Sequence, residues 1–329
     1  MGVHDGHIGE MLSSVYQVPN AEIVGMVEPN DALFEKACRG REIPRYPSLD
    51  DMISDARPEL IIEGLNHREK LELVEKAAQA GAHLLLDKPL CVNLEHYERM
   101  KAAVERSGIK VSMWFTSRTY PPFMKLREHI LAGDLGELVS FISTHPHKLG
   151  SWRPDWYFDP DTYTGVFHDL ACHGVDQIRW LSGAEFTGVH ALSAVNKYAG
   201  TTLVDHVQAS FQLSDGSCAT VTADWLTPET CPSFGDTRFI IMGTEGSAHL
   251  RAYAGDHLLI VSNKKGVLEP SFDDIAARPQ LKQAVIKELI DSIERGEEPS
   301  VSTADVFAVA RACLIAQESA KQGGVFLKI

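Results

Sequence analysis

The first third of the chain alternates short apolar runs with stretches in which apolar residues recur at helical spacing. Short runs that end at polar or turn residues predict strands, whereas the longer periodic stretches predict helices. Strands are predicted at 21–27, 60–62, 83–86 and 110–115, and helices at 10–16, 69–80 and 94–107. Gly81 follows one of these helices as a C-cap. Because strands alternate with helices of this length, we expect right-handed βαβ units and a parallel sheet.

The pattern changes after about residue 117. Helices are predicted at 123–132, 166–181, 281–294 and 303–321, and alternating runs that predict strands fill 187–263. Asp215-Gly216 lies between two of these runs and marks a hairpin turn. We therefore expect an α/β protein with a Rossmann domain and parallel sheet at 1–117. At 118–329 we expect a second α/β domain, whose large and mainly antiparallel sheet is open on one face.

The composition of the 329 residues agrees with two globular domains, since 44% are hydrophobic and 23% are charged. The net charge of −14 argues against a nucleic-acid partner, which requires a basic surface. No apolar run approaches the roughly 18 residues of a membrane-spanning helix, and the start does not resemble a signal peptide. The six cysteines form no CxxC pair, so we expect reduced cysteines in a soluble, cytoplasmic protein that binds no membrane.

The start of the chain carries a degraded dinucleotide fingerprint. Such a fingerprint places glycines where the backbone approaches a pyrophosphate, followed by a helix N-terminus that favours its negative charge. Gly6 and Gly9 match the last two glycines, with His7 and Ile8 between them, but His4 stands where the first glycine is expected. The alternative interpretation is a flexible, glycine-rich end.

A second departure is the short stretch of chain before the fingerprint. Fingerprint glycines normally follow a buried strand of about five or six residues. Here only Met1-Gly2-Val3 precede the turn. We therefore expect the innermost strand of the sheet to be missing or unusually short.

Glu28 ends the predicted strand at 21–27, about 20 residues after the fingerprint. An acid at this place accepts hydrogen bonds from the ribose of NAD and repels the 2′-phosphate of NADP. Neither Arg nor Lys occurs at 29–33. Together with the βαβ alternation, this favours an NAD site over a solvated acid at the end of a strand.

Two further segments carry side chains suited to acid–base chemistry. Lys88 follows a predicted strand at the carboxyl end, where open α/β sheets bind ligands, and its charge would stabilise a developing alkoxide. Asp169 and His173 are four residues apart and share one face of a helix. His173 would accept a hydroxyl proton while Asp169 orients its ring. The alternatives are a surface lysine before a proline, a capping Asp and a buried structural His.

Aromatic and cationic residues gather between the two predicted domains. Trp152, Arg153, Trp156 and Tyr163 suit a sugar-binding surface, or else they pack a loop against the second sheet. The segment His145-Pro146-His147 has the spacing of two metal ligands on one strand face, but a third ligand is not evident, so we expect no metal.

Five segments, in order, resemble the Gfo/Idh/MocA family of nicotinamide-dependent oxidoreductases. AGAHLLLDKPL resembles the family's AGKHVLVEKPL-like segment, and TGVFHDLACHGVDQIRWLSG resembles its GGGxLxDxGxHxxDxxxWLxG block. LAGDLGELVSF, GTEGSAHL and STADVFAVARACLIAQESAKQGGVFL resemble the turn into the second domain, a hairpin and the closing segment. The matches run along nearly the whole chain.

The resemblance implies an NAD-binding Rossmann domain and a substrate-binding domain whose open sheet forms a homodimer or homotetramer. It assigns catalysis to Lys88, Asp169 and His173. With the residues singled out above, the expected NAD-binding set is Gly6, His7, Ile8, Gly9, Glu28, Asn66, His67, Asp87 and Lys88. The expected substrate-binding set is Lys88, Trp152, Arg153, Trp156, Tyr163, Asp169 and His173.

Three departures from the family pattern are evident. Asp87 replaces a Glu, and Gly165 is what remains of a triple glycine. In the loop after the predicted strand at 60–62, the segment Glu63–His67 replaces a Thr-Pro, and Lys70 stands where a later His is usual.

These observations predict an NAD-dependent dehydrogenase that transfers hydride between nicotinamide and a carbinol of a sugar, cyclic polyol or sugar derivative. One alternative within the family is a redox-neutral glycosidase, in which bound NAD transiently oxidises a glycoside before elimination. Another is a noncatalytic, nucleotide-sensing regulator, and the retention of Lys88 and His173 argues against it.

Overall fold

The computed structural model of the protein describes residues 1–2, 6–275 and 278–329, and the chain divides into two compact units. Unit 1 comprises Met1–Trp114 and Ala277–Phe307, and unit 2 comprises Phe115–Ala276 and Ala308–Ile329. The first change of unit falls close to the predicted boundary at 117. The return of the chain to unit 1 after residue 276 is a feature that the sequence pattern does not predict.

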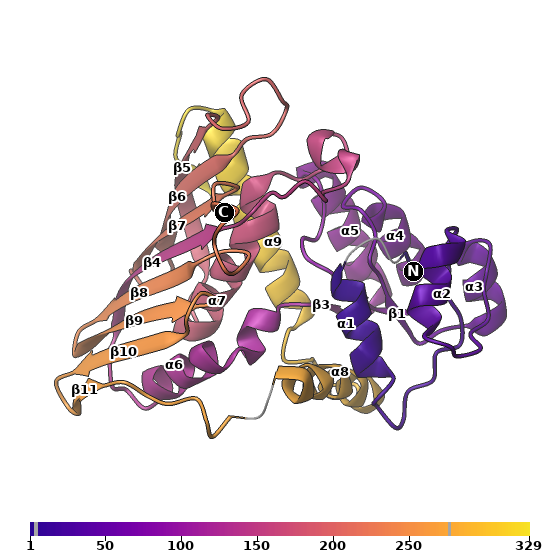
Figure 1. Ribbon diagram of the computed structural model, residues 1–329, viewed down its shortest axis with the longest axis horizontal. Coiled ribbons are helices and arrows are strands. Elements are labelled where there is room, and N and C mark those ends of the chain that lie inside the picture. The colour runs from indigo at the N-terminus through magenta and orange to yellow at the C-terminus, as the bar shows by residue number, and fades with distance from the viewer. Residues whose placement is uncertain (3–5, 276–277) are drawn as a thin grey trace. The chain divides into compact units, whose positions relative to one another are not determined.

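Unit 1 holds a parallel sheet with, over its described residues, three strands in the order β1-β2-β3 (Figure 1). The strands are β1 (Leu60–Ile62), β2 (His83–Leu86) and β3 (Val111–Met113). The helices are α1 (Gly6–Val15), α2 (Asp31–Cys38), α3 (Leu49–Ala56), α4 (Lys70–Ala80), α5 (Leu94–Ser107) and α8 (Arg278–Arg295). Gly81 caps α4 with a φ of 76°, as predicted. The predicted parallel sheet with helical crossovers is confirmed.

The hydrophobic core of unit 1 joins α1 and α8 to the sheet. Ile8 and Met11 of α1 belong to the same buried cluster as Leu85 of β2 and Ile286 and Leu289 of α8. The apolar side chains of α1 recur three or four residues apart, so one face of the helix is committed to this core. The N-terminus of α1 is thereby fixed beside the sheet.

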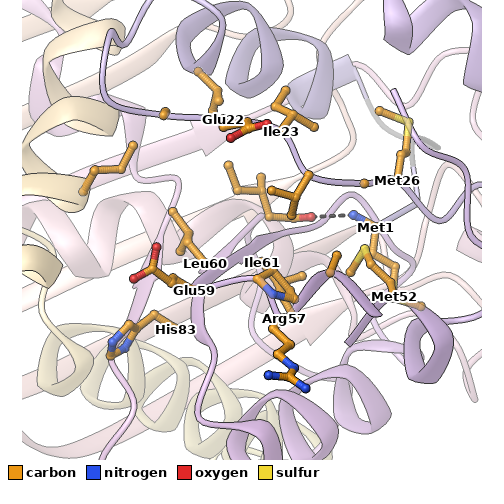
Figure 2. Close-up of a pocket in the computed structure, with 18 of the residues that line it drawn as sticks. Met1, Glu22, Ile23, Met26, Met52, Arg57, Glu59, Leu60, Ile61 and His83 are labelled. Carbon is orange, nitrogen blue, oxygen red and sulfur yellow. Dashed lines mark hydrogen bonds between the residues drawn. The ribbon is translucent and has the colours of Figure 1, made fainter. Parts of the chain in front are cut away.

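The predicted strand at 21–27 is wrong. Within the described chain, only an isolated parallel bridge between Met26 and Arg45 forms there. A strand persists where a neighbour supplies hydrogen bonds to its backbone. Residues 21–25 line a cavity (Figure 2), so a neighbouring strand does not fill this side of the segment. Val3 and His4, on which two sequence expectations rest, lie outside the described residues.

Unit 2 holds a nine-stranded sheet over its described residues, in the order β11-β10-β9-β8-β4-β7-β6-β5-β12. The strands are β4 (Leu138–Pro146), β5 (Phe186–Ala194), β6 (His206–Leu213), β7 (Cys218–Asp224), β8 (Thr237–Gly243), β9 (Gly246–Ala252), β10 (His257–Ser262), β11 (Gly266–Leu268) and β12 (Leu327–Lys328). β4 and β7 are parallel, and the other neighbours are antiparallel.

The helical segments of unit 2 are short apart from three α-helices. The α-helices are α6 (Pro121–Leu131), α7 (Cys172–Ser182) and α9 (Thr303–Lys321), and residues 308–321 of α9 belong to this unit. The short segments are η1 (Thr116–Thr119), η2 (Asp155–Phe158) and the π-helical turn η3 (Phe167–Ala171). α6, η3 and α7 all pack on strands of the sheet, and Figure 1 shows α6 and α7 on the same side of it.

The sheet of unit 2 buries one face and exposes the other. Along β6, Val207 and Ala209 are buried, whereas Gln208 and Ser210 are exposed. This period of two is that of a sheet covered on one side only. The prediction of a large, mainly antiparallel and open sheet is confirmed.

Two expectations from composition concern the helices and the cysteines. In the described part of the chain, the helices lack the length and apolar character that crossing a membrane requires. Disulfides are absent among the six cysteines, all of which are described, and four of them are buried. The buried cysteines pack as small hydrophobic residues.

Candidate functional site

The fingerprint residues form the first turn of α1, which begins at Gly6 rather than at the predicted residue 10. Backbone N–H groups of a first helical turn have no carbonyl partner within the helix, so those of His7 and Ile8 are suited to bind an anion. The side chain of Ile8 is buried in the core, which leaves only its backbone for a ligand. A Cβ on Gly9 would meet no described heavy atom within 4 Å, so this helix surface is open. The geometry fits a dinucleotide pyrophosphate.

His7 connects this turn to Asp87 at the carboxyl end of β2. Nδ1 of His7 lies 3.1 Å from each carboxylate oxygen of the buried Asp87. Burial alone raises the pKa of Asp87, but the neighbouring His7, Lys70 and Lys88 outweigh burial and hold that pKa well below its ordinary value. Asp87 is therefore a carboxylate, and its Oδ1 accepts the N–H of Lys88 at 2.7 Å.

Lys70 is a fully buried cation beneath the same turn. Its Nζ donates to the carbonyl oxygens of Asp87, at 2.6 Å, and Pro89, at 2.9 Å. The same Nζ lies 3.1 Å from Oε1 of buried Glu63, and this oxygen accepts the N–H of Asp87 at 2.7 Å. Burial raises the pKa of Glu63, and the charge of Lys70 opposes that rise. The buried pair therefore fixes the backbone on both sides of Lys88, whose own side chain is half-buried.

The loop after β1 has a structural role in starting α4. Oδ1 of Asn66 accepts the N–H groups of Arg68 and Glu69, immediately before the helix. His67 is buried. Cofactor contacts from Asn66 and His67 stay predictions.

Glu28 is buried at the end of the segment that follows α1. Its Oε1 accepts the N–H of Asn30 at 2.8 Å, and Asn30 is the N-cap of α2. The carboxylate thus orders the turn into α2, and its contact with the ribose of NAD stays a prediction.

Two arginines outside residues 29–33, Arg39 and Arg45, bond to the backbone of Gly9 and Glu28. Nε of Arg45 donates to the carbonyl oxygen of Glu28, and its Nη1 pairs with Asp31 at 2.6 Å. Nη2 of Arg39 donates to the carbonyl oxygen of Gly9 at 3.0 Å. Both arginines are distant in sequence from the residues they contact, so only the fold reveals them.

In unit 2, Asp169 lies within the π-helical turn η3, and His173 is the second residue of α7. A π-helical turn closes with i→i+5 bonds, so the α-helical spacing behind their predicted shared face does not apply along the whole segment. Oδ2 of the buried Asp169 accepts the hydroxyl of Tyr163 at 3.1 Å. His173 is half-buried and meets Phe115 edge to face, with 6.0 Å between ring centroids.

Two glycines allow this segment to lie close to its neighbours. Gly165 has a φ of 102°, and a Cβ on it would lie 2.6 Å from Oε1 of Gln317 on α9. A Cβ on Gly174 would lie 2.1 Å from Nε2 of His145 on β4. Burial lowers the pKa of His145 to about 3, so its ring is neutral and acts in packing. Glycine is therefore required at both ends of the segment that carries Asp169 and His173.

The aromatic residues predicted to bind substrate differ in exposure. Tyr163 is buried and stacks on Tyr157, with 4.8 Å between ring centroids. Trp156 is half-buried, and its ring centroid lies 4.3 Å from that of Tyr157. Nη1 of Arg153 donates to the Tyr157 hydroxyl at 2.8 Å. Trp152 is 56% exposed. Packing therefore covers the ring of Tyr163, whereas Trp152 presents its ring to solvent.

The histidines of the His145-Pro146-His147 segment are packed against aromatic rings. His145 lies beside Phe239, and His147 lies beside Trp225 and Phe234. In the part of the chain that the structure describes, His, Cys, Asp and Glu nowhere form a group of three or more arranged to hold a metal ion.

Sequence families match the two parts of the chain in order. Residues 2–115 match the oxidoreductase family with an NAD-binding Rossmann fold, and residues 123–249 match the GFO/IDH/MocA C-terminal domain. Together the two matches cover most of the chain.

Individual relatives match almost end to end. The scyllo-inositol 2-dehydrogenase (NAD(+)) of Bacillus subtilis (strain 168) is 24% identical over 320 residues, which cover 94% of this chain and 89% of that protein. An oxidoreductase structure from Erwinia carotovora atroseptica SCRI1043 has a TM-score of 0.87 at 22% identity and covers 97% of both chains. A levoglucosan dehydrogenase in complex with NADH has a TM-score of 0.85 at 20% identity, covering 100% of this chain and 97% of that one.

At these identities the two structures establish the fold alone, and the paired family matches establish the family. The parallel sheet of unit 1, the nine-stranded sheet of unit 2 and both matched regions agree. The chain belongs to the Gfo/Idh/MocA family of NAD(P)-binding oxidoreductases.

Proposed function

We propose that the protein is an NAD-dependent dehydrogenase that transfers hydride between nicotinamide and a carbinol of a sugar, cyclic polyol or sugar derivative. The observation that carries the proposal is the anchoring of Lys88. Its N–H is bonded to a carboxylate that His7 connects to the fingerprint helix, and Lys70 binds the carbonyl groups before and after it. Such rigid support is expected of a residue that must meet a reacting oxygen.

The relatives support the substrate class. One is named a scyllo-inositol 2-dehydrogenase, and another is a levoglucosan dehydrogenase. Both names describe the oxidation of a hydroxyl-bearing ring, which agrees with the class that the residues of this chain suggest.

The proposed roles follow from the chemistry of each side chain. When bound, NAD supplies the hydride acceptor. His173 takes the proton of the hydroxyl group, and the ammonium of Lys88 stabilises the negative charge that develops on its oxygen. Asp169 is a positioning residue for His173, and Tyr163 orients Asp169 through its hydroxyl. The N–H groups of the first turn of α1 and the carboxylate of Glu28 hold the pyrophosphate and ribose.

The open sheet face of unit 2 is proposed as the interface of a homodimer or homotetramer. Ile142, Leu192, Met242 and Val261 are exposed large apolar residues on four of its strands, and the pairing registers place them on one face. Light scattering of the purified protein would measure the number of subunits in the oligomer. A monomer at micromolar concentration would contradict this proposal.

Turnover of NAD with a panel of polyols, sugars and glycosides tests the function. We expect stoichiometric NADH with at least one free polyol or sugar. Glycoside cleavage without net NADH would instead establish the redox-neutral glycosidase. Tight NAD binding without turnover of any compound would favour the regulator.

A further inference from the structure

Arg153 is a half-buried cation of unit 2 that precedes η2. Its Nε donates to the carbonyl oxygen of Leu149 at 3.2 Å, and its Nη1 donates to the hydroxyl of Tyr157 at 2.8 Å. Its Cζ also lies over two rings, 4.8 Å from the centroid of Tyr157 and 5.1 Å from that of Trp225. These neutral partners hold the guanidinium in place without cancelling its charge.

The guanidinium of Arg153 has donors to spare. A guanidinium carries five N–H groups, and the bonds to Leu149 and Tyr157 use two of them. The other three have no protein acceptor in the described part of the chain, and the half-buried side chain leaves them accessible to solvent. They are therefore available to a ligand.

The charge of Arg153 also lacks an acidic partner. Among the described residues, no carboxylate pairs with it within 4.0 Å, although Asp and Glu outnumber Lys and Arg by 45 to 31 in the chain. Other arginines of the same unit differ in this respect. Arg118 pairs with Asp176, and Arg179 pairs with Glu185. Arg153 is thus a positioned cation whose counter-ion the described protein does not supply.

A short series of contacts connects Arg153 to the proposed catalytic segment. The Tyr157 hydroxyl accepts from Arg153, and the ring of Tyr157 stacks on Tyr163 with 4.8 Å between centroids. The hydroxyl of Tyr163 then donates to Oδ2 of Asp169 at 3.1 Å. Two stacked tyrosine rings therefore separate the guanidinium from Asp169, a separation that a sugar ring and its substituent can span.

The chemistry of this cation favours a carboxylate ligand. The planar guanidinium matches the two oxygens of a carboxylate through parallel N–H···O bonds. It supplies one positive charge, which balances one carboxylate, whereas a phosphate monoester carries about −1.5 to −2 near neutral pH. The neighbouring cation, Lys148, is already bonded to the carbonyl oxygens of Glu229 and Cys231.

We propose that Arg153 binds a carboxylate of the substrate, so that the preferred substrate is a sugar acid, such as a uronic or aldonic acid. The inference rests on the proposed function, because it places the carbinol of the same molecule at His173. The carboxylate takes no part in hydride transfer and serves only to bind and orient. A chain of net charge −14 repels anions at long range, so an anionic substrate requires a local cation of this kind.

Matched compounds test the proposal on the full chain with NAD. The pairs are glucose with glucuronate, galactose with galacturonate, and glucose with gluconate, and glucose 6-phosphate is the phosphate probe. We expect kcat/KM for at least one acid to exceed that of its neutral parent at least tenfold. Arg153→Met should remove this preference. Arg153→Lys keeps the charge but not the planar fork, so it should retain only part of the preference.

Lys148→Met is the matched control. It removes the same charge from a neighbouring residue whose ammonium is bonded to carbonyl oxygens, so the preference for the acid should persist. Equal losses in Lys148→Met and Arg153→Met would overturn the proposal, because only the overall charge would then matter. If Arg153→Met fails to fold, Arg153→Lys decides, and an unchanged preference in that variant would overturn the pairing.

Calorimetry measures binding without turnover, on protein saturated with NADH, which cannot accept hydride. The Kd of the preferred acid should rise at least tenfold in Arg153→Met. Binding that depends on Arg153, without turnover of any compound, would refute the proposed function and still support the carboxylate site. Turnover that favours the neutral parents would do the reverse. Tighter binding of glucose 6-phosphate than of every acid would overturn the assignment to a carboxylate.

Discussion

The hydroxyl of Tyr163 donates to the carboxylate of Asp169 at 3.1 Å, and both residues are buried. Burial, reinforced by the charge of Asp169, raises the pKa of Tyr163 well above its ordinary value, so the phenol stays protonated and remains a donor. A residue predicted to bind substrate and a residue predicted to act in catalysis thus form one hydrogen-bonded pair.

Replacing Tyr163 with Phe should therefore lower both stability and turnover. The ring would still stack on Tyr157, but Asp169 would lose a donor. A hydrogen bond to a charged group contributes about 1.5–3 kcal/mol, which urea unfolding would measure. Tyr157→Phe is the matched control, because its hydroxyl accepts from Arg153 instead. We expect it to lose comparable stability and to keep kcat; unchanged kcat in Tyr163→Phe would show that Asp169 does not depend on this bond.

A methyl group at Gly174 should displace the segment that carries His173. The Cβ of Gly174→Ala would lie 2.1 Å from Nε2 of His145, which is buried and has little room to move. Overpacking of this kind costs about 1–3 kcal/mol, and kcat should fall with it.

The double variant Gly174→Ala with His145→Ala supplies the control. Removal of the imidazole makes room for the new methyl group. The double variant should therefore be more stable than the single variant His145→Ala, in which Gly174 is unchanged. If the two substitutions simply add, the contact between Gly174 and His145 is not the reason for the glycine.

Lys70 should prove essential to the shape of the turn at Lys88. Lys70→Met leaves Glu63 without its cation, and breaking a buried pair costs about 3–5 kcal/mol. The carbonyl groups of Asp87 and Pro89 also lose a donor. We expect the melting temperature and kcat to fall together.

The double variant Lys70→Met with Glu63→Leu separates stability from positioning. It removes both charges, so part of the stability should return, although the N–H groups of Asp87 and Leu65 lose the acceptor that Glu63 provides. The carbonyl groups around Lys88 still lack their donor, so kcat should stay low while KM for NAD changes less. Full recovery of kcat would mean that the pair contributes stability alone.

The sequence pattern was sufficient to predict the bounds of those helices and strands whose packing or pairing partners lie nearby in the chain. The bounds of β1, β2 and α5 agree with prediction to the residue, because apolar runs end there at polar or turn residues. The strand predicted at 21–27 failed because a strand also needs a neighbour, and local pattern does not reveal whether one is present.

The contacts that hold the residues of the candidate site in place were harder to predict from the sequence. Lys70 follows Arg68 and Glu69 at the start of a predicted helix, where a charged residue is typical of the surface, yet its partners Glu63 and Asp87 converge on it from the ends of two strands. The pairing of Gly174 with His145 likewise joins a helix to a strand about 30 residues away in sequence.

His173→Ala should lower turnover far more than it weakens cofactor binding. The imidazole acts on the substrate proton and not on the nucleotide, and removal of a general base typically costs on the order of 10² to 10⁴ in rate. Lys88→Met should also reduce kcat, because the charge that stabilises the developing alkoxide is lost. Steady-state rates with the best substrate of the panel, together with a directly measured Kd for NAD, would check both variants. Wild-type kcat in either variant would remove that residue from the mechanism.

The protein should bind NAD at least tenfold more tightly than NADP, a difference of about 1.4 kcal/mol. Glu28 would repel a 2′-phosphate, and Arg45 beside it already binds the carbonyl oxygen of Glu28 and the carboxylate of Asp31. Glu28→Gln keeps an oxygen that can accept the N–H of Asn30 and removes only the charge, so it should narrow the preference without unfolding the turn. Calorimetric Kd values for both cofactors, at one salt concentration, measure the effect. Tighter NADP binding by the unaltered protein would refute the preference, and an unchanged ratio in Glu28→Gln would show that another group sets it.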